Sequence, residues 1–473
     1  MSRIAIEFVQ SQLFRAEGRL KPYLQSIEGR HVYPKRFAFF RVDGLLKKFI
    51  SSRAEERWVV MPGISGVGKT TILAQLYRDF KARFQANNIL FVSLDEAALS
   101  GISLKDIIDA YESILGVSYE ELKQPVMILI DEAHRDPKWS SALKVLWGRS
   151  KKVFTICTGS SAVLLAPHLE DVGRRITVEK LYPLSFLEYE MIKRKQYPEA
   201  KLKQKIKELI YTSSDAASAF LELKKLQPEI NKKWASYNRA DIAEYLNIGT
   251  VPFALQSSDE ASVFLAIDRI IDKLIQKDIL ELGDFKVDTH KQIKPLLLYL
   301  AQGNLLSVSK AGSLFNLTKN TLQDVLDVLV KAEILIKVPP FKAENKASKY
   351  LFMCPALRNA LLDISGLKAT QETRRGDVLE DAMALHLYRE FVAPGYGKIT
   401  HDPAQGGADF ILDLRIGKRI VIEIGASDKR VTQAQQTLEK AKADYGIVYN
   451  TDPLAMSENS KIIKIPHDFF FLM

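Results

Sequence analysis

The sequence predicts an α/β protein whose central element is a parallel sheet covered by helices on both faces. Continuously apolar runs at 58–61, 89–94, 126–130 and 153–157 alternate with segments of helical periodicity. Such runs are typical of strands that are buried on both faces, as in parallel sheets. A glycine-rich loop at 63–71 joins the first run to a helical segment, which is the context of a phosphate-binding loop.

The composition is that of a soluble chain with several domains. With 473 residues, 47% hydrophobic and 26% charged, about two to four domains are expected. The net charge of +10 allows a nucleic-acid partner without requiring one. The two cysteines, Cys157 and Cys354, are too few for a disulfide framework or a zinc cluster. No signal peptide or membrane-spanning run is recognisable, so the expected location is the cytoplasm, with no membrane partner.

Residues 1–56 precede the core and show helical periodicity. Ile4, Phe8, Leu13 and Leu20 have the spacing of one helix face, and residues 45–50 predict a second helix. We expect this segment to lead into the core without contributing chemistry.

The loop at 63–71 has the pattern G-x-x-x-x-G-K-T, which makes it a P-loop of the NTPase type. Its glycines let backbone N–H groups face a phosphate, and the following helix adds its positive N-terminal dipole. Lys69 is expected to reach the β- and γ-phosphates, and the Thr70 hydroxyl to ligate Mg²⁺, so ATP and Mg²⁺ are the expected cofactors. The expected nucleotide-binding residues are Gly63, Ser65, Gly66, Val67, Gly68, Lys69, Thr70 and Thr71.

Two acids, Asp131 and Glu132, end the apolar strand that begins at residue 126. Ligands bind at the carboxyl ends of parallel strands. We expect Asp131 to hold Mg²⁺ through its water shell and Glu132 to orient or deprotonate the attacking water, on a strand beside the P-loop strand or one strand away. The letters Asp-Glu-Ala-His invite a helicase interpretation, but no second RecA-like domain follows residue 183. His134 is therefore expected at a surface or hinge position.

Other polar residues of the core are weaker candidates. Thr158 and Ser160 lie where a sensor of the γ-phosphate would be placed, although ordinary turn chemistry explains these residue types equally well. Arg174 and Arg175 are candidates for a finger that reaches the nucleotide of a neighbouring subunit, and Arg175 is the one expected to act in catalysis. A pair of solvated arginines is the alternative. Further elements are expected as helices at 104–115 and 141–146 and as a strand at 175–178.

Several segments resemble the AAA-like ATPases of bacteria and archaea whose C-terminal half carries a restriction-endonuclease-like domain of the PD-(D/E)xK type. The most specific segment is LYPLSFLEY at 181–189. The others are GISGVGKTT at 63–71, LIDE at 129–132, TGSS at 158–161, GR at 173–174 and YLNIGTVP at 245–252, where Thr250 stands in place of the usual second glycine. The resemblance covers most of residues 57–450.

The patterns and the resemblance together imply five regions. These are an N-terminal helical lead-in at 1–56, a P-loop ATPase core at 57–185, a helical lid or connector at 186–285, a winged helix at 286–362 and a restriction-endonuclease-like domain at 374–473. The lysine-rich helices of the connector usually indicate a solvated face, with a nucleic-acid groove as the alternative.

The region at 286–362 has the order of a winged helix, with three helices followed by a hairpin. The helices are expected at 293–300, 308–315 and 318–329, and the strands at 335–338 and 349–352. In the DNA-binding form, the third helix presents Thr318, Lys319, Asn320 and Gln323 to a groove. A winged helix that contacts protein is the alternative.

The last region carries an acid on a helix, an acid at the start of a strand and an acid on the next strand: Glu380, Asp409 and Glu423. This is the layout of the restriction-endonuclease-like core, in which carboxylates gather around Mg²⁺. The three residues are therefore candidate metal ligands. The family pattern has a lysine two residues after the strand glutamate, but Gly425 occupies that position.

The glycine leaves two interpretations of the last region open. Either a displaced lysine, with Lys418 and Lys429 the nearest, completes a nuclease, or the fold keeps metal or DNA contacts without cutting. For the whole chain, we expect Mg²⁺-dependent ATP hydrolysis that acts on or with DNA. The alternative is a nucleotide-dependent switch that assembles with protein partners, and a homo-oligomer is open in both cases.

Overall fold

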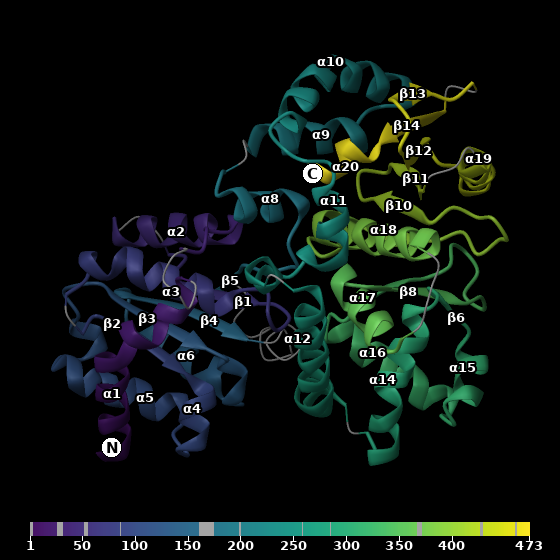
Figure 1. Ribbon diagram of the computed structural model, residues 1–473. Coiled ribbons are helices and arrows are strands. Elements are labelled where there is room, and N and C mark those ends of the chain that lie inside the picture. Colours follow the sequence, from purple (N-terminus) through teal and green to yellow (C-terminus); the bar gives the residue numbers. More distant parts are fainter. Residues whose placement is uncertain are drawn as a thin grey trace. The chain divides into compact units, whose positions relative to one another are not determined.

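The computed structural model describes residues 3–25, 32–51, 55–85, 87–159, 175–197, 200–257, 259–283, 285–366, 371–425, 429–458 and 461–473. The chain divides into two compact units, Met1–Tyr182 and Pro183–Met473 (Figure 1). Together they form a mixed α/β protein with a parallel sheet in the first unit and two further sheets in the second.

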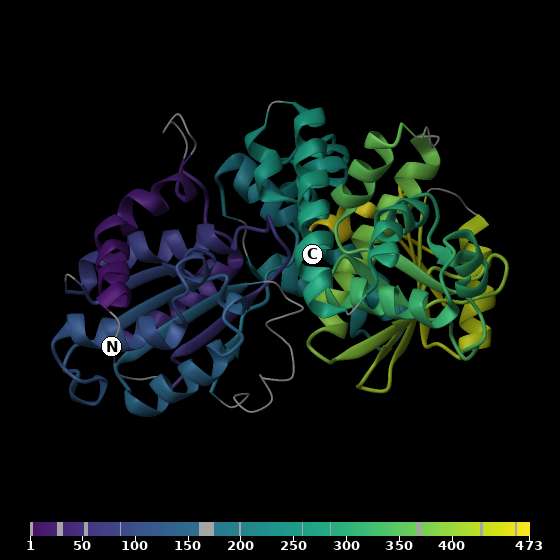
Figure 2. The same cartoon turned by 90° about the horizontal axis from the view of Figure 1, so that it is seen from below.

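The first unit is built on a five-stranded parallel sheet with the order β2-β3-β4-β1-β5, whose long strands lie side by side in Figure 2. Its strands are β1 (Trp58–Pro62), β2 (Ile89–Ser93), β3 (Val126–Asp131), β4 (Val153–Gly159) and β5 (Thr177–Val178). Only β4 separates β3 from β1, so the strand that ends in Asp131 lies one strand away from the P-loop strand. The parallel core predicted from the apolar runs is confirmed.

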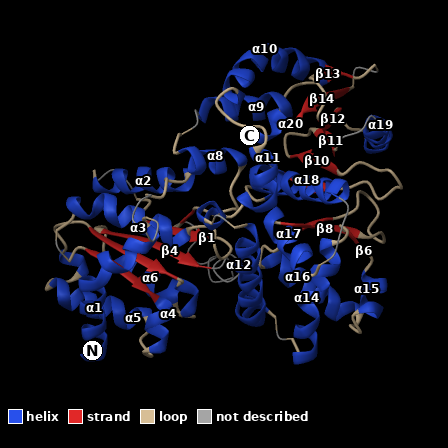
Figure 3. Cartoon of the chain, in the orientation of Figure 1, coloured by secondary structure: helices blue, strands red, loops and turns tan. Residues whose placement is uncertain are grey.

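Helices cover both faces of this sheet, as Figure 3 shows. They are α1 (Arg3–Leu20), α2 (Phe37–Ile50), α3 (Lys69–Phe80), α4 (Leu94–Leu99), α5 (Leu104–Leu115) and α6 (Trp139–Arg149), with short turns η1 (Lys21–Tyr23), η2 (Lys81–Arg83), η3 (Tyr119–Glu121) and η4 (Ala133–Arg135). The helices α2 and α3 lie on one face, and α1, α4 and α5 lie on the other. This arrangement leaves the carboxyl ends of the strands to the P-loop and the acids.

Local signals explain where the predicted helices begin and end. The helix predicted at 104–115 is confirmed residue for residue, because Ser103 forms a capping box with Asp106 and Gly116 ends the helix at a φ of 69°. The helix predicted at 141–146 is longer and spans α6. The strand predicted at 89–94 stops at Ser93, because Leu94 begins the short helix α4.

The N-terminal segment contributes to the apolar core of the first unit. Ala5 and Val9 on α1 belong to the same buried cluster as Leu90 on β2 and Ile107 on α5. Helix α1 packs against both of these elements. The segment expected only to lead into the core therefore covers one edge of the sheet.

The second unit begins with helices. These are α8 (Phe186–Arg194), α9 (Ala200–Tyr211), α10 (Ala216–Trp234), α11 (Asp241–Glu244), the π-helical turn η6 (Tyr245–Gly249), η7 (Pro252–Gln256), α12 (Glu260–Lys273), the π-helical turn η8 (Leu274–Asp278) and α13 (Ile279–Leu282). A capping box between Ser185 and Glu188 starts α8 within the LYPLSFLEY segment.

A small module of helices and a three-stranded sheet follows. Its elements are α14 (Val287–Ala301), β6 (Leu305–Leu306), α15 (Val308–Leu314), α16 (Lys319–Lys331), β7 (Leu335–Val338) and β8 (Ser348–Phe352), and α17 (Pro355–Ile364) packs beside it. The sheet is antiparallel, with the order β6-β8-β7. All three predicted helices and both predicted strands are present, and β6 is an addition.

The C-terminal sheet has six strands in the order β13-β14-β12-β11-β10-β9. The strands are β9 (Gly397–Thr400), β10 (Phe410–Leu414), β11 (Arg419–Ile424), β12 (Tyr445–Asn450), β13 (Ala455–Met456) and β14 (Ile462–Pro466); the helices are α18 (Gln371–Leu387), the π-helical turn η9 (Tyr388–Val392), α19 (Lys429–Ala441) and α20 (His467–Phe471). The pairs β11–β12 and β12–β14 are parallel, and the remaining pairs are antiparallel.

The helices after Pro183 also contact this C-terminal sheet. The Tyr211 and Tyr449 hydroxyls lie 3.2 Å apart, and the Tyr445 hydroxyl donates a 2.6 Å bond to the carbonyl of Ile210. The α10 helix packs against β13 and β14. Across the described ranges, no helix is both long and apolar enough to cross a membrane.

Candidate functional sites

The P-loop follows β1 and is shaped by its glycines. The φ angles of Gly66 and Gly68 are 86° and 92°, in the left-handed region that disfavours side chains. A Cβ on Gly63 would lie 2.6 Å from the carbonyl oxygen of Leu181, so a larger residue would push the two segments apart. The loop turns directly into α3 at Lys69, which places the helix N-terminus against the loop.

Lys69 is buried and lies across the P-loop. Its Nζ donates to the carbonyl oxygens of Gly63 at 2.7 Å and Ile64 at 3.2 Å. The ammonium is therefore held at the mouth of the loop, at the carboxyl end of β1. A phosphate bound by the backbone amides of the P-loop would replace the two carbonyl oxygens as the partner of Lys69.

The carboxylate of Asp131 joins the P-loop to β4. The Thr70 hydroxyl donates a 2.8 Å bond to Oδ2 of Asp131, and the Thr158 hydroxyl donates to Oδ1. Burial raises the pKa of Asp131, as does the Glu132 carboxylate, and both threonine hydroxyls counteract this. A hydroxyl and a carboxylate are hard oxygen donors, so this pair fits Mg²⁺.

Glu132 adopts a left-handed backbone conformation, with a φ of 54°, at the end of β3. Its amide donates a 3.4 Å bond to Oγ1 of Thr158, and its Oε2 lies 3.3 Å from Nδ1 of His134. The His134 side chain is only 1% exposed. Of the surface or hinge position expected for His134, the surface position is wrong, because the side chain is buried in the turn η4, which packs against α4 and β4.

The remaining candidates of the core are not brought to this centre. Ser160 and Arg174 lie outside the described residues. The guanidinium of Arg175 lies 5.2 Å from the centre of the Trp147 ring, next to Arg57, which contacts the same ring and precedes β1. Arg175 is thus at the amino end of the sheet, opposite the P-loop. A role toward a second copy of the chain stays a prediction.

The N-terminal segment supplies residues that the sequence did not identify. Arg36 is buried and donates to the carbonyl oxygens of Val67 at 2.6 Å and Tyr182 at 2.9 Å, so it clasps the P-loop. Burial raises the pKa of Tyr23, and the charges of Asp131 and Glu132 contribute to the rise. Nothing in the local spacing of residues 1–56 signals either feature.

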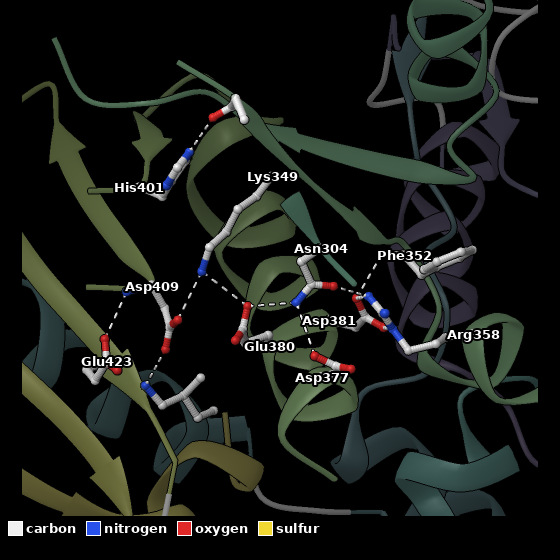
Figure 4. A network of polar contacts seen from close by, with 12 residues as sticks. Asn304, Lys349, Phe352, Arg358, Asp377, Glu380, Asp381, His401, Asp409 and Glu423 are labelled. Atoms are coloured by element: carbon white, nitrogen blue, oxygen red, sulfur yellow. Dashed lines mark hydrogen bonds and ion pairs between the residues drawn. The ribbon is translucent and has the colours of Figure 1, made fainter. Parts of the chain in front are cut away.

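A second group of acids lies between α18 and the start of the C-terminal sheet (Figure 4). Oε2 of Glu423 accepts a 2.9 Å bond from the amide of Asp409, and Oδ2 of Asp409 accepts a 3.1 Å bond from the amide of Ile424. Glu380 faces Asp409 from α18. We name Glu380, Asp409 and Glu423 the carboxylate cluster. The structure brings all three predicted acids together.

The cation of this cluster is a lysine that the sequence did not suggest. Nζ of Lys349, on β8, donates to Oδ1 of Asp409 at 3.0 Å and to Oε2 of Glu380 at 3.3 Å. Lys418 is not the displaced lysine, because its Nζ bonds the carbonyl oxygens of Thr212 and Ser213. The side chain of Lys429 lies outside the described residues.

Burial sets the protonation of the cluster. It raises the pKa of Glu380 to about 7, together with the Asp409 charge and against the effect of Lys349. Burial alone would lower the pKa of Lys349, but the Asp409 and Glu380 carboxylates raise it above its usual value. Within the described part of the chain, no group of three His, Cys, Asp or Glu side chains is arranged to hold a metal ion.

The buried ion pair of Arg358 and Asp381 is linked to Glu380 through Asn304. Arg358 donates to Oδ2 and Oδ1 of Asp381 at 2.5 and 2.8 Å, and to Oδ1 of Asn304 at 2.5 Å. The amide of Asn304 in turn donates a 3.0 Å bond to Oε2 of Glu380. Arg358 and Asp381 are fully buried, so this network fixes the orientation of Asn304 toward the cluster.

The third helix of the small module, α16, is capped by Thr318, whose hydroxyl accepts the amide of Thr321 at 3.1 Å. Thr318, Lys319 and Asn320 are exposed. Gln323 is half-buried and donates a 2.9 Å bond to Asp327 on the same helix. Three of the four residues expected to face a groove are therefore accessible.

Several lysines of the connector at 186–285 pair with acids. Lys203 and Lys207 lie 3.3 and 2.9 Å from the two oxygens of Glu390, and Lys193 lies 2.7 Å from Glu244. These pairs reduce the case for a basic groove along the connector.

The chain is similar to known proteins in two of its regions and over most of its length. A family model described as an AAA domain matches residues 55–190, and a domain of unknown function, DUF8612, matches residues 239–368. The chain is 31% identical over 445 residues to the uncharacterized protein MJ1637 of Methanocaldococcus jannaschii, which covers 93% of this chain and 89% of that protein. Residues 55–190 are thus an AAA-type P-loop ATPase domain.

Among solved structures, Aeropyrum pernix Orc1 in complex with DNA is 13% identical, with a TM-score of 0.33 over 73% of this chain and 97% of that chain. Cdc6p of Pyrobaculum aerophilum is 12% identical, with a TM-score of 0.28 over 71% of this chain and 97% of that chain. A RuvB variant of Thermotoga maritima is 14% identical, with a TM-score of 0.28 over 65% and 90%.

Proposed function

We propose that this chain, which belongs to the same family as the protein MJ1637 of Methanocaldococcus jannaschii, hydrolyses ATP with Mg²⁺ and uses the reaction to act on DNA. One observation carries the ATPase part. Oδ2 of Asp131 accepts the Thr70 hydroxyl at 2.8 Å, and Glu132 follows directly at the same strand end. The AAA-type domain at 55–190 supports the same conclusion.

The residues of the first unit have separate roles in this proposal. The backbone amides of the P-loop and the ammonium of Lys69 bind the phosphates. Thr70 and Asp131 hold Mg²⁺, which when bound neutralises charge on the β- and γ-phosphates. Glu132 orients or deprotonates the water that attacks the γ-phosphate, and Thr158 keeps the Asp131 carboxylate in place. Arg36 holds the loop in shape through the carbonyl of Val67.

The small module is the proposed DNA contact. Its order of helix, strand, two helices and two antiparallel strands is the order of a winged helix, and the exposed residues Lys319 and Asn320 lie at the start of its third helix. The net charge of +10 favours association with DNA through the phosphate backbone.

The C-terminal domain is proposed to be nuclease-like. Three carboxylates from α18, the start of β10 and β11 supply the hard oxygen donors that Mg²⁺ and Mn²⁺ prefer, although in the described structure they are not arranged around an ion. Glu380, Asp409 and Glu423 would hold the ion, which when bound activates water and stabilises charge on a phosphate. Lys349, from the small module, contacts two of these carboxylates, and Gly425 stands where the family pattern has a lysine.

The DNA dependence of ATP turnover tests the proposal. We expect duplex DNA at low salt to change the steady-state rate of the full chain, and Lys69→Ala to remove both the rate and its response. Lys81→Ala, just beyond α3, is the matched control, because Lys81 is exposed and pairs with Glu17. An ATPase without any DNA binding at low salt, where electrostatic binding is strongest, would favour a switch that assembles with protein partners.

A further inference from the structure

Lys349 connects two sheets of the second unit. It lies on β8, where it pairs with Leu305 of β6 and Val338 of β7. Its side chain leaves this three-stranded sheet and ends between Glu380 and Asp409, as Figure 4 shows. The side chain is only 11% exposed. The ammonium is thus a buried part of the carboxylate cluster, although it belongs to the small module.

Two residues of the small module donate hydrogen bonds to Glu380. Oε2 of Glu380 accepts both Lys349 at 3.3 Å and the amide of Asn304 at 3.0 Å. Asn304 is tied to the strand next to Lys349, since its carbonyl accepts the amide of Tyr350 at 2.8 Å. Arg358 fixes the other side of the Asn304 amide group. These contacts move together if β8 moves relative to α18.

A divalent cation and this ammonium compete for the same oxygens. Mg²⁺ requires oxygen ligands at about 2.1 Å, and Mn²⁺ has similar preferences for carboxylates. Lys349 lies within 3.3 Å of one oxygen on each of two carboxylates. Two positive charges at such a separation repel strongly in a site with little water. An ion that took these two oxygens as ligands would have to displace the ammonium from them.

We propose that Lys349 is a built-in lock, which keeps the carboxylate cluster closed to divalent cations until β8 is withdrawn from α18. The inference rests on the proposed metal-binding role of Glu380, Asp409 and Glu423. It adds that the resting chain holds its own cation in that place, and that the small module controls access.

Mn²⁺ binding to the nucleotide-free full chain tests the lock, measured by electron paramagnetic resonance of the free ion. Lys349→Met removes the charge and keeps the length of the side chain. We expect this variant to bind Mn²⁺ at least about tenfold more tightly than the unmodified chain, because a buried pair is replaced by two uncompensated carboxylates. Lys337→Met is the matched control on β7, since Lys337 pairs with Asp327 away from the cluster.

The identity of the bound site is tested by adding Glu423→Gln to Lys349→Met. Loss of the gained Mn²⁺ affinity in the double variant supports the lock. If the double variant keeps the gained Mn²⁺ affinity, the ion binds outside the carboxylate cluster, and this result overturns the lock. A third outcome is that the unmodified chain and Lys349→Met bind Mn²⁺ with equal affinity and that Glu423→Gln abolishes binding in both. This outcome overturns the lock but leaves the metal-binding role intact. No Mn²⁺ binding to either chain overturns the lock and the metal-binding role together.

Two further measurements keep the proposal testable if Lys349→Met does not fold. In the unmodified chain, Glu423→Gln is expected to leave the Mn²⁺ isotherm unchanged, and a change would overturn the lock. Lys349→Arg keeps the positive charge and is expected to stay closed to Mn²⁺.

Discussion

The hydroxyl of Thr70 donates a 2.8 Å hydrogen bond to Oδ2 of Asp131, although 61 residues separate them. Thr158 donates to the other oxygen, so both oxygens of a buried carboxylate are bound by threonines. Burial raises the pKa of Asp131, as does the charge of Glu132, and the two hydroxyls lower it. The threonines therefore favour the ionised form of Asp131 that can attract Mg²⁺.

Removing the hydroxyl of Thr158 is expected to weaken hydrolysis more than it changes the fold. We predict that Thr158→Val lowers kcat/KM for Mg²⁺-ATP by about 10- to 100-fold, as is usual when a residue that supports a metal ligand is lost. Thr155→Val is the matched control, because Thr155 is also buried on β4 but lies nearer the start of the strand. Equal rates for both variants would contradict a supporting role of Thr158.

Arg36 is expected to matter for the shape of the P-loop. Arg36→Met leaves the carbonyls of Val67 and Tyr182 without their buried donor, which costs about 1–3 kcal/mol for each unsatisfied group. We predict a higher KM for ATP and a lower melting temperature. Arg41→Met is the control, since Arg41 forms a more exposed ion pair with Glu179 and such pairs contribute about 0–1 kcal/mol. A similar change of KM and melting temperature in both variants would contradict the stabilising role of the Arg36 hydrogen bonds.

The pair formed by Arg358 and Asp381 gives a prediction of stability. Both side chains are fully buried, so Arg358→Met leaves Asp381 as an uncompensated charge. We predict a loss of about 3–5 kcal/mol in the free energy of unfolding, measured by chemical denaturation. The double variant with Asp381→Leu is expected to recover much of this loss. A double variant that is as unstable as Arg358→Met would contradict the electrostatic explanation.

His386 gives a prediction of pH dependence. Its pKa is lowered from 6.5 to about 3, chiefly by burial; Glu390 opposes this shift, and the cations Arg389, Lys203 and Lys207 add to it. The folded chain holds this ring neutral, so the stability is fully present above pH 6.5 and is lost as the pH falls toward 3. Between pH 6.5 and 5 the loss is about 2 kcal/mol, since one bound proton changes stability by about 1.4 kcal/mol per pH unit.

Unfolding measured at several pH values checks this prediction. The variant His386→Leu is expected to lose less stability than the unmodified chain over the same interval. Parallel profiles for the two proteins would show that His386 is not the group responsible.

The DNA contact is tested on one helix. We predict that Lys319→Ala weakens DNA binding and reduces the salt dependence by about one phosphate contact. Lys331→Ala is the matched control at the other end of α16. Equal effects on affinity, or none from Lys319→Ala, would remove the start of α16 from the proposed interface.

Local patterns predicted the P-loop, the strand that ends in Asp131 and the three acids Glu380, Asp409 and Glu423. The signals were the glycine-lysine pattern after an apolar run, the acids at the end of a buried strand, and the order of helix acid, strand-start acid and strand acid in the last region. The parallel arrangement then followed, because continuously apolar strands must be covered on both faces.

The sequence could not predict contacts between distant elements. Arg36 reaches Tyr182 across 146 residues, and Lys349 reaches Asp409 across 60 residues. Neither residue lies in a motif, and a lone arginine or lysine is ordinarily a solvated surface residue. The buried position of His134 was missed for a related reason, since the turn after Glu132 depends on the left-handed conformation of that residue.

Hydrolysis of ATP by Glu132→Gln tests the central claim most directly. In a single-turnover assay with Mg²⁺, the variant is expected to bind ATP as the unmodified chain does, because the P-loop, Thr70 and Asp131 are intact. Its hydrolysis rate is expected to fall by at least about 100-fold, the lower range for loss of a general base. A variant that hydrolyses ATP at the unmodified rate would contradict the assignment of this site.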